Sequence, residues 1–181
     1  MKKSIKTNQD YCISFMRLFS ITLILTLVTP VIINAQAGKT SFAGDWTFNA
    51  EKSTQPQGGG GGARMGGGNF AATQEANLLT VVRTRTGQDG QATTITMKYT
   101  LDGKESINTS ARGDSKSVAK WSADGKSLTI ETSRTMDMNG ESRTMKSTEV
   151  WVLTDAKTLT ITTTRQGQNG EVKTVMVYDK K

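Results

Sequence analysis

The sequence predicts an all-β protein, a single antiparallel up-and-down barrel of eight or nine strands. From Leu78 to the C-terminus, apolar and polar residues alternate, and Thr, Val, Ile, Tyr and Trp are frequent, as is typical of half-buried strands. Asn-Gly and Asp-Gly pairs recur at hairpin spacing, and no stretch of this region has a helical period. Short connections and one apolar face favour a sheet that closes on itself, because closure removes the exposed edges.

The first 37 residues have the layout of a secretory signal peptide. A basic start is followed by an almost wholly apolar run over residues 18–33 and by the small residues Ala35-Gln36-Ala37. We expect cleavage after Ala37 and translation from Met16, because Met16-Arg17 and the apolar run would form a more ordinary signal on their own. The mature protein is then periplasmic or secreted, with no membrane insertion. An uncleaved anchor is the alternative.

The amino-acid composition limits the kinds of bond and binding partner open to the chain after residue 37. Cys12 is the only cysteine and precedes the expected cleavage site, so the mature chain has no disulfide and no thiol nucleophile. The net charge of +7 falls to +4, since residues 1–37 hold four basic residues and one acidic residue. This charge is typical of a soluble protein and does not indicate nucleic-acid binding.

Catalytic groups are scarce. The chain has no histidine, which excludes Ser-His and Cys-His dyads and histidine metal sites. Most aspartates fall in expected turns, where local hydrogen bonding accounts for them. The sequence therefore predicts a protein that is not an enzyme and that has no cofactor and no metal.

The mature chain begins with a short strand and a glycine-rich stretch. Gly44–Asn49 is predicted to be the first strand. Eight of the 18 glycines lie between residues 58 and 68, so we expect a disordered loop over residues 55–69. No Gly-Lys-Ser/Thr sequence follows, which argues against a phosphate-binding loop.

A repeated hairpin follows. Each copy opens with Leu-Thr-Val or Leu-Thr-Ile, reaches an arginine six residues after the leucine, turns at a glycine and returns to an aromatic residue. Because side chains alternate along a strand, the phase predicts which residues face the barrel interior. Besides the recurring arginines, this set comprises Leu79, Val81, Arg83, Ile95, Met97, Tyr99, Leu101, Ile107, Trp121, Leu128, Ile130, Thr132, Met145, Glu149, Trp151, Leu153, Leu159, Ile161, Thr163, Met176 and Tyr178.

The recurring arginines Arg85, Arg134 and Arg165 share that phase and are the leading candidates for a binding site. Guanidinium groups near one end of a barrel can bind a carboxylate or phosphate, while apolar side chains hold the rest of a ligand. Met97, Tyr99, Glu149 and Trp151 complete the predicted ligand-facing set. The alternative is that the arginines lie at the rim and extend into water, or are turned outward by a β-bulge.

Gly44-Asp45-Trp46 near the start of the predicted barrel resembles the Gly-x-Trp motif in the first strand of lipocalins. Residues 41–179 are similar in pattern to small exported bacterial lipocalin-like (calycin-type) proteins, with Thr154-Asp155 in place of the family's Thr-Asp-Tyr. The resemblance implies a cup for a small hydrophobic ligand, with Gly44 and Trp46 plugging one end and the glycine-rich segment near the mouth. It also implies an arginine packed on the Trp, for which Arg165 is the nearest candidate.

Two functions remain open at this point. One is an exported binding protein for a small hydrophobic or amphipathic molecule, with an acidic group on the arginines. The other is a non-catalytic structural or interaction domain of the cell envelope whose barrel is filled by its own side chains. The identity of a protein partner does not follow from the sequence.

Overall fold

The computed structural model describes residues 38–54, 68–86, 90–110, 113–138, 141–167 and 170–181, and all its regular structure there is β-strand. The predicted signal peptide and most of the glycine-rich segment lie outside these residues. The strands are β1 (Gly44–Thr54), β2 (Phe70–Glu75), β3 (Leu78–Thr86), β4 (Ala92–Thr100), β5 (Glu105–Ser110), β6 (Gly113–Trp121), β7 (Ser127–Met138), β8 (Glu141–Asp155), β9 (Thr158–Gly167) and β10 (Gly170–Lys180).

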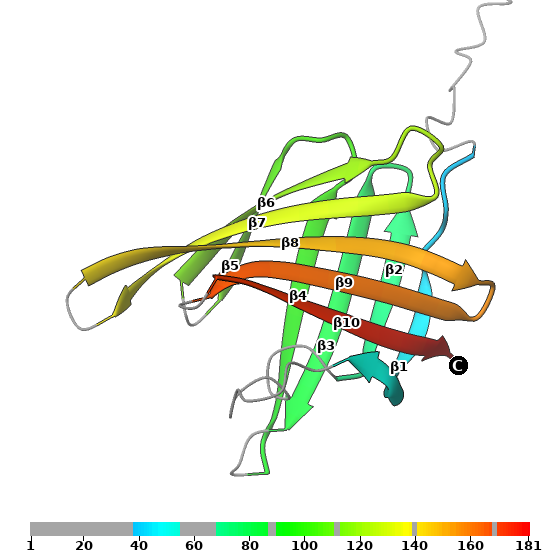
Figure 1. Cartoon of the computed structure of the whole chain (residues 1–181), viewed down its shortest axis with the longest axis horizontal. Helices are drawn as coiled ribbons and strands as arrows, with labels where there is room; N and C mark the ends of the chain where they lie inside the picture. The colour runs from blue at the N-terminus through cyan, green and yellow to red at the C-terminus, as the bar shows by residue number, and fades with distance from the viewer. Residues whose placement is uncertain (1–37, 55–67, 87–89, 111–112, 139–140, 168–169) are drawn as a thin grey trace, which may run out of the picture. The chain divides into compact units, whose positions relative to one another are not determined.

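The ten strands form one antiparallel sheet in which each strand pairs with a neighbour in the sequence, and β1 also pairs with β10 (Figure 1). The predicted all-β, up-and-down barrel is therefore confirmed. The predicted count of eight or nine strands is wrong, because β2 follows the glycine-rich segment without a strong strand signal. Its sequence, Phe-Ala-Ala-Thr-Gln-Glu, contains mostly residues with low strand propensity.

The barrel closes between β4 and β5 through side chains. Lys98 N donates to Asn108 Oδ1 at 2.7 Å, and Asn108 Nδ2 donates back to Lys98 O at 3.0 Å. Thr100 N donates to Ser106 Oγ at 2.8 Å. The side-chain carboxamide of Asn108 thus replaces a backbone peptide group of a neighbouring strand. It satisfies the backbone N–H and C=O of Lys98 at the edge of β4.

These hydrogen bonds between β4 and β5 explain why the prediction for Ile107 is wrong. Ile107 was expected to face the interior, but it is 61% exposed, while Ser106 and Asn108 on either side are buried. The face of a strand follows its register, and here the register turns the two bridging polar side chains inward. Hydrophobicity alone predicts the opposite face.

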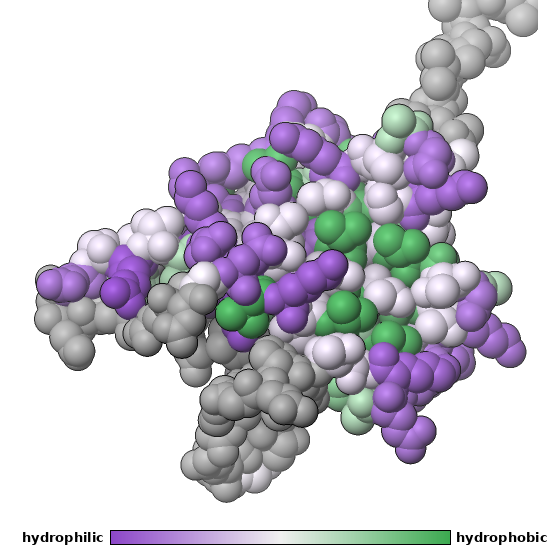
Figure 2. All heavy atoms as spheres, in the orientation of Figure 1, coloured by the Kyte–Doolittle hydropathy of each residue, from purple (hydrophilic) through white to green (hydrophobic). Residues whose placement is uncertain are grey.

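The β7–β8 hairpin extends beyond the ends of its neighbours (Figure 1). Its pairing continues to Met138 and Glu141, whereas β6 pairs with β7 only as far as Arg134. On the outer surface, hydrophilic side chains surround a smaller group of apolar ones on the face shown in Figure 2. The described residues contain no helix that is long and apolar enough to span a membrane.

Candidate functional site

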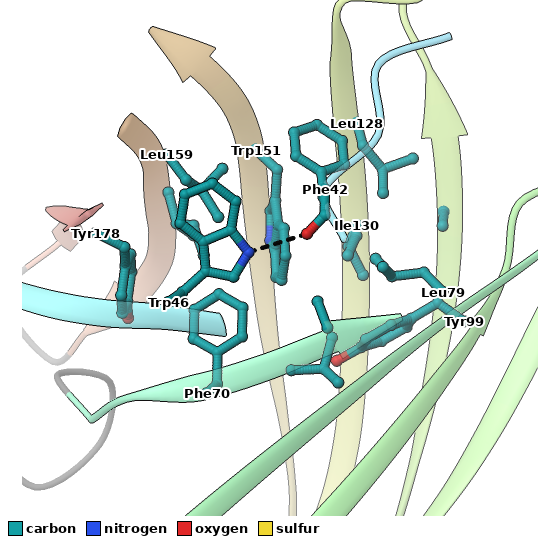
Figure 3. Packing of buried hydrophobic residues seen from close by; sticks show 14 of the residues in the cluster. Phe42, Trp46, Phe70, Leu79, Tyr99, Leu128, Ile130, Trp151, Leu159 and Tyr178 are labelled. Carbon is teal, nitrogen blue, oxygen red and sulfur yellow. Dashed lines mark hydrogen bonds between the residues drawn. The ribbon is translucent and has the colours of Figure 1, made fainter. Parts of the chain in front are cut away.

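One end of the barrel interior is filled by aromatic side chains. Phe42 is fully buried, stacks on Trp121 at 5.7 Å between ring centroids, and meets Trp151 edge-on at 5.8 Å. Phe70 contacts Trp151 and Tyr178 in turn. Trp46 is 1% exposed, and its Nε1 donates to Phe42 O at 2.9 Å (Figure 3). We call this group, Phe42, Trp46, Phe70, Trp121, Trp151 and Tyr178, the aromatic end.

The short segment before β1 holds the aromatic end together. Thr40 N donates to Gly125 O in the β6–β7 turn. The Gln74 carboxamide accepts from Phe42 N at 2.9 Å and donates to Thr40 O at 3.1 Å. Sequence reasoning missed Phe42, because a lone aromatic residue before a strand has no periodicity to mark it as buried.

Gly44 and Trp46 both lie beside the side chain of Lys180. Gly44 has φ +143°, and a Cβ there would lie 2.5 Å from Lys180 Cε. The Lys180 ammonium lies 5.4 Å from the centre of the Trp46 ring. The cation placed on Trp46 is therefore Lys180 and not Arg165. Glycine at position 44 leaves room for the lysine side chain to reach the indole.

The other half of the interior is polar. Along the inner faces of β6 to β9 the apolar residues give way to small hydroxyl side chains and to Arg134 and Glu149. Thr132 pairs with Ser117 on one side and Ser147 on the other. Ser117 Oγ and Thr132 Oγ1 are 2.9 Å apart. We call this region the polar half.

Arg134 lies on the inner face of β7, between Ser115 of β6 and Met145 of β8. Its Nε is buried and has no hydrogen-bond partner within the described part of the chain. A buried N–H donor without a partner costs free energy, because it has lost water without gaining an acceptor. The position therefore suits a ligand that brings its own acceptor.

Glu149 lies on the inner face of β8, between Ile130 and Thr163. Its Oε2 accepts a hydrogen bond from Trp151 Nε1 at 3.0 Å. Among the described residues, it forms no ion pair with any arginine. The indole therefore orients the carboxylate and leaves it able to accept another donor.

Tyr99 and Met97 face this region from β4. Tyr99 is 5% exposed, and its hydroxyl donates to Met97 Sδ at 3.4 Å. Burial raises the pKa of the Tyr99 hydroxyl, and the Glu149 carboxylate raises it further, while Arg83 and Arg134 act in the opposite direction. Tyr99 thus stays neutral, and it lies close enough to Glu149, Arg83 and Arg134 for their charges to act on its hydroxyl.

Arg83 faces the interior, as the strand phase predicts, although it is not one of the recurring arginines of the repeat. Its guanidinium lies 4.7 Å from the centre of the Phe70 ring, at the border of the aromatic end and the polar half. The alternation of β3 places it in phase with Leu79 and Val81. The period-two pattern of the sequence therefore predicts this inward position.

The other two predicted arginines are Arg85 and Arg165. The side chain of Arg85 lies outside the described residues. Arg165 of β9 is partly buried and pairs with Ser147 and Val172. It borders an open depression that is also lined by Lys146, Gln166 and Glu171. The structure thus brings together Arg134, Glu149, Trp151, Tyr99 and Met97 of the predicted set.

Comparison with solved structures finds a similar chain in zebrafish ileal bile acid-binding protein complexed with cholic acid. The two share 17% sequence identity, with a TM-score of 0.54, over 78% of this chain and 100% of that one. The two chains share the fold of an antiparallel β-barrel. No protein-family model and no curated protein matches the sequence.

The arrangement is suited to binding. The described residues include no group of three or more acidic or Cys side chains that could hold a metal ion. The interior presents an arginine whose buried Nε has no partner among the described residues, an oriented carboxylate and a neutral phenol, beside a packed group of aromatic rings. Such a surface can hold a molecule that has both a charged group and an apolar body.

Proposed function

We propose that this chain is an exported bacterial binding protein, without catalytic activity, that holds a small amphipathic anion inside its barrel. The anionic group lies on Arg134, and the apolar body lies against Met97 and the edge of the aromatic end. The observation that carries the proposal is the interior guanidinium of Arg134, whose Nε is buried without a partner in the described residues.

Charge supports an anionic ligand. Among the described residues, no carboxylate forms an ion pair with Arg134. A ligand with an acidic group would supply that missing counter-charge. The calycin-like fold also supports binding of an apolar body, because a structural neighbour is described as a bile acid-binding protein in complex with cholic acid.

A titration tests the proposal. The full chain is expressed in a bacterial host and purified, and binding of 8-anilinonaphthalene-1-sulfonate and of dodecanoate is followed by fluorescence and calorimetry. We expect saturable binding of both, and Arg134→Gln should weaken it at least tenfold, since it removes a charge-assisted hydrogen bond. Lys120→Gln, which removes an exposed cation on the outer face of β6, should leave affinity unchanged.

Absence of binding, or equal affinity in Arg134→Gln, would contradict the proposal. Absence of binding would favour a structural or interaction domain with a filled barrel. The intact mass of the same preparation tests export: we expect an N-terminus at Gly38. A retained N-terminus at Met1 or Met16 would contradict cleavage after Ala37.

A further inference from the structure

The polar half contains a second polar position, separate from Arg134. Glu149 of β8 and Thr163 of β9 are directly paired across the two strands, on the inner face. Thr163 Oγ1 is buried and has no hydrogen-bond partner among the described residues. A fixed carboxylate acceptor therefore lies beside an unsatisfied hydroxyl, and the two atoms are supplied by neighbouring strands.

The two positions are well separated along the barrel wall. Glu149 pairs with Ile130, whereas Arg134 lies four residues further along β7, which corresponds to about 13 Å of strand. The pair between them, Thr132 and Ser147, has small side chains. The cation and the carboxylate thus belong to two levels of one wall rather than to one ion pair.

The chemistry of the two positions is different. Arg134 forms its strongest hydrogen bond with an acceptor that carries negative charge. Glu149 would repel such a group but accepts hydrogen bonds, and the Thr163 hydroxyl can donate or accept. Buried polar groups are normally satisfied, so a ligand that fits this wall needs a donor opposite Glu149 and Thr163 as well as an acid opposite Arg134.

Resting on the proposed function, we infer that the preferred ligand is a hydroxylated amphipathic acid, with a hydroxyl group several bonds from its carboxylate, and that Glu149 and Thr163 determine this specificity. The hydroxyl donates to the Glu149 carboxylate and accepts from Thr163. An unsubstituted fatty acid would leave both protein groups unsatisfied and would bind more weakly.

The test compares two acids that differ only by a terminal hydroxyl, 12-hydroxydodecanoate and dodecanoate, by calorimetry on the full chain. The wild-type protein should bind the hydroxy acid about tenfold more tightly, the expected effect of one hydrogen bond to a charged group. In Glu149→Gln the preference should fall to about threefold or less, because the acceptor loses its charge but still serves Trp151 Nε1.

A second variant and a control variant distinguish a loss of specificity from a general loss of folding. Thr163→Val keeps the shape of the side chain, removes its hydroxyl and should also reduce the preference. Glu131→Gln removes an exposed carboxylate from the outer face of β7 and should retain the full preference.

The outcomes separate this inference from the proposed function. Equal binding of the two acids by the wild-type protein, or a preference that survives in both Glu149→Gln and Thr163→Val, would overturn the specificity role while leaving anion binding on Arg134 intact. Failure of either acid to bind would overturn the proposed function and this inference with it.

Discussion

The aromatic end and the polar half are lined by the same strands but differ in how their polar atoms are satisfied. At the aromatic end, Trp46 Nε1, the Phe42 backbone amide and the Gln74 carboxamide have hydrogen-bond partners. Trp121 Nε1 is buried without a partner among the described residues. In the polar half, Arg134 Nε and Thr163 Oγ1 are buried with no partner among the described residues. One barrel thus combines a region that stabilises the fold with a region whose polar groups suit a ligand.

The difference implies that stability and binding are separable. Burial of aromatic rings against one another contributes favourable free energy whether or not a ligand is present. Unsatisfied buried polar groups destabilise the free protein and become favourable only when a ligand supplies their partners. Substitutions in the two regions should therefore have opposite effects on stability.

The largest effect is expected at the aromatic end. Phe42→Ala should lower the free energy of unfolding by about 3–5 kcal/mol, since it removes a fully buried ring from contact with Trp121 and Trp151. Urea unfolding followed by tryptophan fluorescence measures the change. Phe48→Ala is the matched control, because Phe48 is only partly buried, and its loss should cost less. Equal costs would show that the segment before β1 is not central to the core.

An effect of opposite sign is expected in the polar half. Arg134→Met should leave the free energy of unfolding unchanged or raise it by about 1 kcal/mol, because it replaces a side chain whose buried Nε has no partner with an apolar side chain of similar length. Urea unfolding without ligand measures this. Arg143→Met, at the exposed hairpin tip, should change stability by less than about 0.5 kcal/mol. A clear loss of stability in Arg134→Met would assign Arg134 a structural role and remove the contrast between the two regions.

The sequence predicted the barrel well, because local signals dominate its construction. The leucines that open the three repeats, Leu79, Leu128 and Leu159, are all fully buried, as the period-two pattern predicts. Turn residues behave as expected too: Asp102, Asp124 and Asp155 each accept a hydrogen bond from the backbone N two residues later.

The candidate site was predictable only in part. The even spacing from Leu128 to Arg134 was enough to predict that this arginine shares the inner face. The missing features depend on contacts between residues far apart in the sequence: Phe42 is buried by strands that begin much later, and Asn108 faces inward because it bridges to Lys98. Neither contact produces a periodic pattern in the sequence. The hydrogen bond between Glu149 and Trp151, in place of an ion pair with an arginine, depends on side-chain geometry alone.

The smallest predicted effect concerns the turn outside both regions, at Asp102. Its carboxylate accepts from Lys104 N at 3.1 Å and lies 2.9 Å from the Lys104 ammonium. Hydrogen bonds from Lys104 lower the pKa of Asp102 to about 2. Because the folded pKa lies below the ordinary value near 4, the stabilising contribution is present above about pH 4 and is lost as the pH falls toward 2.

Melting temperatures of wild type and Asp102→Ala, measured from pH 7 down to pH 2, should therefore differ slightly at neutral pH and converge in acid. Thr109→Ala, an exposed change with no titrating group, should show a constant difference. A gap for Asp102→Ala that is unchanged at pH 2 would mean that the turn is held by hydrogen bonding alone. Because this turn lies apart from Arg134 and Glu149, the same substitution should leave ligand affinity unaltered, which separates surface electrostatics from the charges inside the barrel.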